Sequence, residues 1–127
     1  MSERVKWITH KGEQILFNNY SGLDEGQYLE EMEETAATLK SAVDKKPLYL
    51  LALTDVSNTT TTAKITEKSR ACRMLLKGVK ATAAIVGVTE TKKVIARIVS
   101  PDLRVFENPE NAKDWLAAQA RNNKRSW

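Results

Sequence analysis

The longest apolar run in the chain, residues 47–53, ends abruptly at a polar and hydroxyl-rich stretch, residues 54–62. Successive side chains of a strand point to opposite faces, so Leu50 and Leu51 represent two faces that are both apolar. A strand that is apolar on both faces is typical of the interior of a mainly parallel sheet. The run therefore predicts a central buried strand, and the polar stretch predicts the loop at its carboxyl end, before a helix.

Two short segments ahead of this strand predict an antiparallel hairpin. Residues 4–10 and 13–20 mix apolar and polar positions on either side of Lys11 and Gly12. Near-alternation of apolar and polar residues is typical of a strand, and a glycine-containing turn between two such segments favours a hairpin. Two antiparallel strands are thus expected before the first helix.

The segment between the hairpin and the central strand has the clearest helical periodicity. Five apolar residues recur at spacings of 3, 4, 3 and 4, which places them on one face of a helix. Asp24 is a suitable N-cap with Gln27 in the capping-box position, and Pro47 excludes continuation of the helix. The predicted inward face is Leu29, Met32, Ala36, Leu39 and Val43.

The rest of the chain alternates between helical and strand patterns. A helix is predicted over residues 63–79, a strand over 80–88, a helix opened by 89–91, a strand over 103–107, and a last helix from Asn108, Pro109 and Glu110. Strands that alternate with helices imply parallel strands joined by right-handed crossovers. The sequence predicts one α/β domain over residues 1–118, with about five mainly parallel strands, an N-terminal antiparallel hairpin and about four helices. A basic, mobile tail is expected over residues 119–127.

Length, cysteine count and charge narrow the class of protein. The chain has 127 residues, which suits one domain, and one cysteine, Cys72, which excludes an internal disulfide. No apolar segment approaches the ~20 residues that cross a bilayer, and the N-terminus does not resemble a secretion signal. The net charge of +4 comes largely from the tail, and no aromatic stacking motif accompanies it. We expect a cytoplasmic protein without a membrane span, and we do not expect nucleic acid as its partner.

Three stretches of the chain resemble a known family. They are residues 50–57, 84–88 and 105–116, and the last matches the ending V-F-x-x-x-E-x-A-x-x-W-L that is common in small bacterial SpoIIAA-like proteins. With the order of elements, they resemble the SpoIIAA-like fold that STAS domains share with CRAL-TRIO lipid-transfer domains. The likeness covers roughly residues 8 to 118. It implies a compact sheet with helices packed on it.

The resemblance implies two kinds of role. STAS domains act through protein contact, and anti-sigma-factor antagonists carry a phosphorylated Ser at the start of the second helix. CRAL-TRIO domains enclose a lipid or another apolar ligand. Antagonists have Asp-Ser-Ser and then Gly before that helix, whereas this chain has a run of Thr followed by Ala63 and Lys64, so hydroxyls are present without the motif.

The polar loop after the central strand is the candidate site for a ligand or for phosphorylation. In parallel α/β folds ligands collect at the carboxyl ends of strands, and a helix N-terminus presents amide hydrogens that favour anions. The loop after the next strand is expected to lie nearby. The alternative is that these side chains only cap helices and turn the chain, for which their residue types are locally favoured. The candidate residues are Asp55, Ser57, Asn58, Thr59, Thr60, Thr61, Thr62, Thr89 and Thr91.

Residue types that carry catalysis or bind metals are scarce. One His, His10, and one Cys, Cys72, do not supply a multi-ligand metal site, and nothing places His10 near Ser57 for a catalytic triad. We therefore expect a surface histidine, a cysteine in the core, no metal and no cofactor. A basic face around the second helix is expected to be solvated, with an acidic partner or anionic lipid as the alternative. Its members are Lys64, Lys68, Arg70, Arg73, Lys77, Lys80, Lys92, Lys93 and Arg97.

These observations favour a non-catalytic protein that works through contact with a protein partner, modulated by an anion or by phosphorylation at residues 55–62. The alternative is a protein that binds a small apolar or amphiphilic ligand in a pocket between the second and third predicted helices and the sheet. A hydrolase that uses Asp55 and the Thr run stays open as a third hypothesis. Because both faces of the central strand are apolar and the chain is small, we also expect a homodimer.

Overall fold

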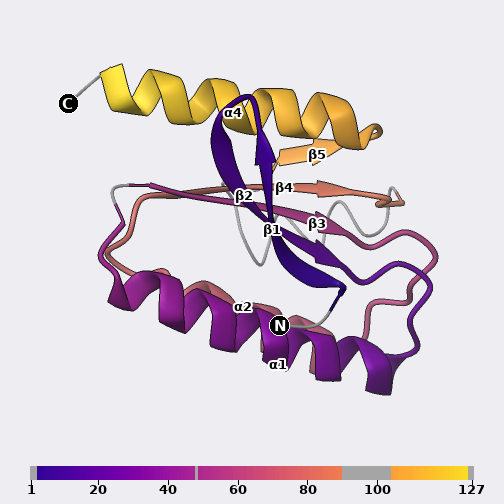
Figure 1. Cartoon of the computed structure of the whole chain (residues 1–127). Coiled ribbons are helices and arrows are strands. Elements are labelled where there is room, and N and C mark those ends of the chain that lie inside the picture. The colour runs from indigo at the N-terminus through magenta and orange to yellow at the C-terminus, as the bar shows by residue number, and fades with distance from the viewer. Residues whose placement is uncertain (1–2, 48, 90–103, 126–127) are drawn as a thin grey trace.

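The computed structural model describes residues 3–47, 49–89 and 104–125 of the chain. The described strands form one sheet whose spatial order, β1-β2-β3-β4-β5, follows the order of the chain (Figure 1). β1 and β2 pair antiparallel, and every other neighbouring pair is parallel. The predicted mixed sheet with an N-terminal hairpin is confirmed. The strands are β1 (Val5–His10), β2 (Glu13–Asn19), β3 (Leu50–Asp55), β4 (Ala81–Val86) and β5 (Arg104–Phe106).

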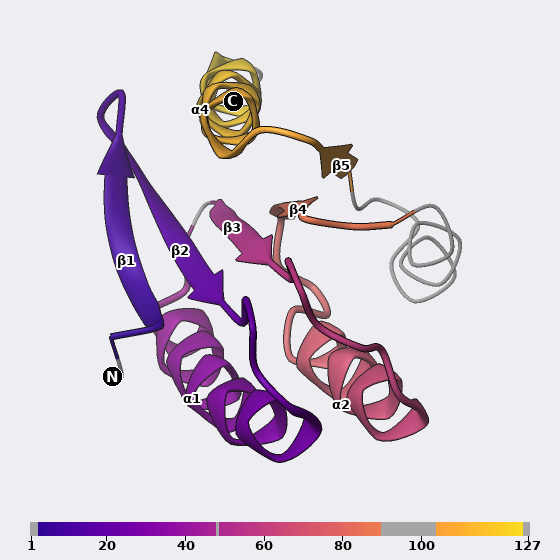
Figure 2. The same ribbon diagram turned by 90° about the vertical axis from the view of Figure 1, so that its right-hand side faces the viewer.

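Helices cover both faces of this sheet. Those within the described residues are α1 (Glu25–Asp44), α2 (Ala63–Met74) and α4 (Pro109–Arg125). α1 and α2 lie side by side on one face, and α4 lies on the other (Figure 2). The connections from β2 to β3 and from β3 to β4 step in the same direction, so crossovers of one hand place α1 and α2 on the same face. Three helices are described where about four were expected, and the missing one falls on residues 90–103, outside the described part of the chain.

The helix ends follow the sequence signals, with one difference. Asp24 accepts a hydrogen bond from the Gln27 amide at 2.8 Å, and the Gln27 side chain accepts one from the Asp24 amide, which completes the expected capping box. α2 ends at Met74, before the predicted residue 79. The reason is that the backbone bonds which follow join residues three apart, as in tight turns, and Gly78 then turns the chain with φ of +82°.

The core has two halves, one on each face of the sheet. On the α4 face, Leu51, Leu53 and Ala84 pack in one cluster with Leu116 and Ala120. Alternate residues of β3 therefore face opposite sides, as predicted. Both faces of β3 are covered by helices of the same chain, so its apolar faces do not require the homodimer expected from the sequence. The cluster on the α1 and α2 face is Val5, Leu16, Tyr20, Tyr28, Met32, Leu39, Val56 and Ile65.

α4 extends beyond the predicted end of the domain. The helix continues to Arg125, and Ala120 is only 1% exposed, although residues 119–127 were expected to form a mobile tail. Ala112, Leu116 and Ala120 recur every four residues, so the apolar face of the helix reaches Ala120, beyond the predicted boundary at residue 118. Within the described residues, no helix is both long and apolar enough to cross a membrane.

Candidate functional site

A cavity of about 200 Å³ lies between α1, α2 and the sheet. Its floor includes Ala52 of β3 and Ala83 of β4. Its walls are formed by the two helices, with Met32 and Leu39 from α1 and Ile65 from α2. The sequence placed a pocket between the second and third predicted helices, whereas this cavity uses the first and second. The third predicted helix lies outside the described residues.

Short side chains explain why a cavity remains here. Ala52 and Ala83 are direct partners in the register of β3 and β4, so two methyl groups lie side by side in the middle of the sheet. α2 contributes Ser69 and Cys72 to the wall, and both are small and partly buried. Protein interiors are normally packed as densely as organic crystals, so short side chains on facing elements leave a gap that their neighbours do not fill.

A chain of hydrogen bonds between polar side chains runs along one side of the cavity. The Thr35 hydroxyl donates to Asn18 Oδ1 at 3.0 Å and lies 3.3 Å from the backbone carbonyl oxygen of Glu31. Both of these oxygens only accept, so Tyr20, whose hydroxyl also bonds the Thr35 hydroxyl, is the donor in that pair. Asn18 Nδ2 donates to Thr54 Oγ1 at 3.4 Å. The protein thus supplies partners for the polar groups on this side.

Tyr28 lines the same cavity but stands outside this chain of bonds. It is 6% exposed, and its ring centroid lies 4.5 Å from that of Tyr20. Burial raises the pKa of the Tyr28 phenol above its ordinary value, so the group is neutral. Its hydroxyl has no hydrogen-bond partner within the described part of the chain. Among the described residues, every polar side-chain atom that is fully enclosed has a hydrogen-bond partner. Because the Tyr28 hydroxyl has none, it is not fully enclosed and borders open space.

The α2 side of the cavity carries the Cys72 thiol, and the Lys68–Glu33 ion pair lies next to it. Burial raises the pKa of the Cys72 thiol above its ordinary value, so the thiol stays protonated at neutral pH. Lys68 pairs with Glu33 of α1, and this pair joins the two helices near Cys72. Arg73 is the one charged residue among the described residues that line the cavity, and it already interacts within the chain.

The predicted polar loop lies at the carboxyl end of β3 and is held by short-range bonds. Asp55 Oδ1 accepts from the Ser57 amide at 2.9 Å and from the Ser57 hydroxyl at 2.6 Å. Thr59 donates to a backbone carbonyl oxygen at 2.6 Å, and Thr62 caps α2 by accepting from the Ile65 amide at 3.2 Å. These are the cap and turn bonds that hydroxyl and carboxylate side chains make locally.

The remaining loop residues are placed as follows. Asn58, with φ of 55°, and Thr60 are exposed, whereas Thr61 is partly buried and lines the cavity. Thr89 is exposed and interacts within the chain, and Thr91 lies outside the described residues. Of the candidate residues that are described, Thr61 is the one that borders the cavity. A role of this loop in anion binding or phosphorylation stays a prediction.

The loops that follow β3 and β4 are in direct contact, as expected. A Cβ atom at Gly87 would lie 2.2 Å from Ser57 Oγ and 2.6 Å from the Ser57 backbone nitrogen. Gly87 also has φ of +81°, a conformation that glycine adopts without cost. Glycine is therefore required at this position, and it brings the two loops together.

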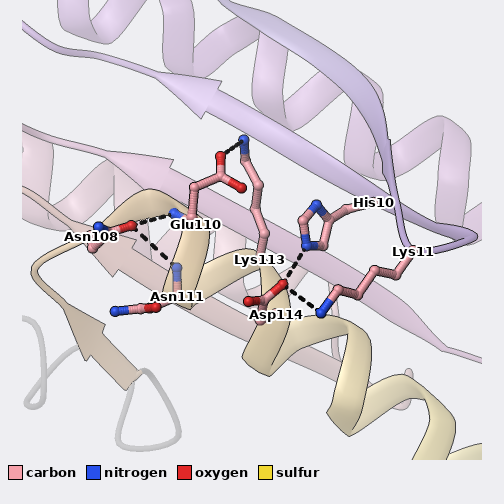
Figure 3. A network of polar contacts seen from close by, with 7 residues as sticks. All are labelled: His10, Lys11, Asn108, Glu110, Asn111, Lys113 and Asp114. Carbon is pink, nitrogen blue, oxygen red and sulfur yellow. Dashed lines mark hydrogen bonds and ion pairs between the residues drawn. The ribbon is translucent and has the colours of Figure 1, made fainter.

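His10 lies at the other end of the sheet and belongs to a separate network. His10 Nε2 and Lys11 Nζ lie 2.7 Å and 2.9 Å from Asp114 Oδ1, which ties the hairpin to α4 (Figure 3). Hydrogen bonds from His10 and Lys11 hold the pKa of the Asp114 carboxyl below its ordinary value. In the register, His10 lies at the amino end of β2 and Asp55 at its carboxyl end, so His10 and Ser57 do not form a triad. No cluster of His, Cys, Asp or Glu in the described residues could hold a metal ion.

Sequence reasoning missed the polar residues of the cavity. The predicted face of α1 included Leu29, which is only partly buried, whereas the buried stripe is Tyr28, Met32, Thr35 and Leu39. These residues recur at spacings of 4, 3 and 4, the same helical period with two hydroxyl groups in it. Buried hydroxyls are costly without hydrogen-bond partners, so two hydroxyl-bearing residues in one inward stripe indicate a polar site. This signal could have identified the α1 wall of the cavity.

Comparison with known proteins identifies the fold. No protein-family model matches the chain, and no curated protein matches it. Among solved structures, the chain is similar to an anti-sigma-factor antagonist (STAS) domain protein from Planctomyces limnophilus, with 12% sequence identity and a TM-score of 0.58. The match covers 89% of this chain and 97% of that one. The predicted STAS-type fold is confirmed, and at this identity the likeness establishes the fold alone.

Proposed function

We propose that this protein is a non-catalytic regulatory domain of STAS-type fold that binds a small, mainly apolar molecule between α1, α2 and the sheet. The observation that carries the proposal is the cavity of about 200 Å³ in the middle of the core. The lining is mainly apolar, so a molecule that covers it removes apolar surface from water, which favours binding.

The regulatory part of the proposal rests on which elements form the walls. The cavity lies between the sheet and both helices, α1 and α2, and the Lys68–Glu33 ion pair links the two helices. A ligand that binds one spacing of the helices better than another shifts the protein toward that spacing. The outer surface of α1 and α2 would change with it, and a partner that contacts this surface would sense occupancy. The structural neighbour is described as an anti-sigma-factor antagonist, which supports a role in protein contact.

Toluene, an apolar ring, is a suitable probe, and Cys72 is a suitable reporter. Cys72 is the single cysteine of the chain and lines the cavity, so the rate at which methyl methanethiosulfonate modifies it reports access to that space. We expect toluene to slow this modification in a saturable way. Backbone NMR signals of the residues that line the cavity should shift over the same concentration range, while those of α4 should not.

Two variants make the experiment specific. Ala83→Leu adds three carbon atoms on the cavity floor, whereas Ala71→Leu adds the same group on the exposed side of α2. Toluene should lose its effect in Ala83→Leu and keep it in Ala71→Leu. The proposal is wrong if toluene changes neither signal in the unaltered protein, or if Ala83→Leu responds as strongly. If Ala83→Leu does not fold, the NMR titration of the unaltered protein decides.

A further inference from the structure

We propose that the occupant of this cavity is a neutral ring compound of about the size of phenol, whose single oxygen atom is bound by the Tyr28 hydroxyl. The inference rests on the proposed function, because it names the chemical class of the ligand that the cavity selects. Three properties of the cavity lead to it: its volume, its mainly apolar lining, and the buried Tyr28 hydroxyl, which lacks a partner among the described residues.

The volume suits one small ring. The cavity measures about 200 Å³, and a dry apolar cavity of roughly 150 Å³ is known to hold benzene. Pockets for larger cofactors and drug-sized molecules begin at roughly 300 Å³. A benzene ring with one or two substituent atoms fits the space, whereas a fatty acid chain or a nucleotide exceeds it.

The lining favours a ligand without charge. Burial raises the pKa values of Tyr20, Tyr28 and Cys72, so all three are neutral at physiological pH. Lys68 and Glu33, whose charges act on Cys72, are paired with each other. Arg73 interacts within the chain already. A carboxylate moved from water into this mainly apolar space would lose hydration, and among the described lining residues only Arg73 carries a charge that could offset the loss.

Two hydroxyls that line the cavity, those of Tyr28 and Thr61, have no partner among the described residues, and Tyr28 is the more deeply buried of the two. The hydroxyls of Tyr20 and Thr35 and the amide of Asn18 are joined in the chain of hydrogen bonds described above. The Tyr28 hydroxyl borders open space and has no partner among the described residues. A phenolic hydroxyl donates and accepts, so it can bond either a hydroxyl or a carbonyl oxygen on the ring. Tyr28 therefore distinguishes an oxygen-bearing ring from a hydrocarbon of the same shape.

Paired ligands test this assignment. Phenol and toluene differ by one hydroxyl in place of a methyl group, and their dissociation constants are measured by NMR titration for the unaltered protein and for Tyr28→Phe. We expect Tyr28→Phe to weaken phenol about 3- to 10-fold relative to toluene, which is the effect of one hydrogen bond. The cost of removing each ring from water cancels in this comparison. Tyr49→Phe is the matched control, because the Tyr49 hydroxyl bonds Thr82 outside the cavity, and it should leave the ratio unchanged.

The outcomes separate this inference from the proposed function. If toluene and phenol bind but their ratio is the same in Tyr28→Phe, the inference is wrong and the proposed function stands. If benzoate binds the unaltered protein as tightly as phenol, the ligand class is wrong, because the cavity then accepts a charge. If no ring compound binds, or if binding survives in Ala83→Leu, the proposed function itself fails. Retained toluene binding in Tyr28→Phe shows that the variant is folded and its cavity intact.

Discussion

Two adjacent alanines of β4 provide a direct test of the cavity. Ala83 lines the cavity on the α1 and α2 face, whereas Ala84 is 0% exposed and packed on the α4 face. Neighbouring residues of a strand point to opposite faces, so the same substitution probes two environments on one strand. Valine is the substitution of choice, because it adds two carbon atoms and favours strands, and the gain in strand propensity applies to both positions.

The expected effects have opposite signs. In Ala83→Val the two added carbon atoms enter existing space, and at ~0.8 kcal/mol for each buried CH₂ group the gain has an upper bound of ~1.6 kcal/mol. Because Ala83 is only partly buried, we expect about 1 kcal/mol of added stability, a rise in Tm of about 3–5 °C for a domain of this size. In Ala84→Val the added atoms meet a close-packed helix, and overpacking of this kind costs about 1–3 kcal/mol.

Urea unfolding followed by circular dichroism measures both free energies, and an unchanged slope against urea shows that both variants unfold in the same way. The two variants should differ by about 2–4 kcal/mol, with Ala83→Val above the unaltered protein and Ala84→Val below it. If Ala83→Val destabilises the protein as much as Ala84→Val, the α1 and α2 face is as closely packed as the α4 face. The cavity, and every conclusion drawn from it, would then be refuted.

Three further predictions concern other parts of the molecule. Gly87→Ala should lower the free energy of unfolding in urea by about 1–3 kcal/mol, because the added Cβ atom meets Ser57 and the residue has a positive φ. Gly78 has a similar φ but lies in open space, so Gly78→Ala should cost less. Equal costs would contradict the contact between Gly87 and Ser57. The pKa of the Asp114 carboxyl is lowered in the folded protein. Its contribution to stability is therefore present above about pH 3.8, and it is lost as the pH falls through the lower pKa of the folded state. Asp114→Asn should therefore flatten the acid side of the stability curve, and an unchanged acid slope would refute the role of His10 and Lys11. Alkylation of Cys72 by iodoacetamide should reach half its maximal rate above pH 9.0, since burial raises the thiol pKa, and a midpoint below that value would contradict its burial.

Much of the fold could be predicted because its signals are local in sequence. The hairpin around Gly12, the capping box of Asp24 and Gln27, and the Asn108 cap, whose Oδ1 accepts from the Glu110 amide at 2.7 Å, all depend on residues within a few positions of each other. The apolar run of β3 is an equally local signal, because consecutive apolar residues show that both faces of the strand are apolar. These features follow from backbone geometry and capping, which a single sequence displays.

The cavity could not be predicted, because it depends on pairings between distant segments. Ala52 and Ala83 meet only through the register of β3 and β4, and nothing in either segment reveals which residues face each other. The predicted inward face of α1 consisted of apolar residues selected by their spacing, so it left out Tyr28 and Thr35, which are buried. The polar composition of the loop after β3 made it the candidate site. The space that a ligand could fill lies instead between the helices and the sheet, where short side chains leave a cavity.

The order of the strands bears on how the protein is made. Because each of the strands β2 to β5 pairs with the strand that precedes it in the chain, the sheet can grow by one strand at a time during synthesis on the ribosome. α4 comes last, and it alone among the described helices packs on Leu51, Leu53 and Ala84. Until α4 has emerged, one whole apolar face of a growing sheet stays exposed to other chains. The contacts of Asp114 with the hairpin then join α4 to strands that were made before it, and α4 covers this apolar face.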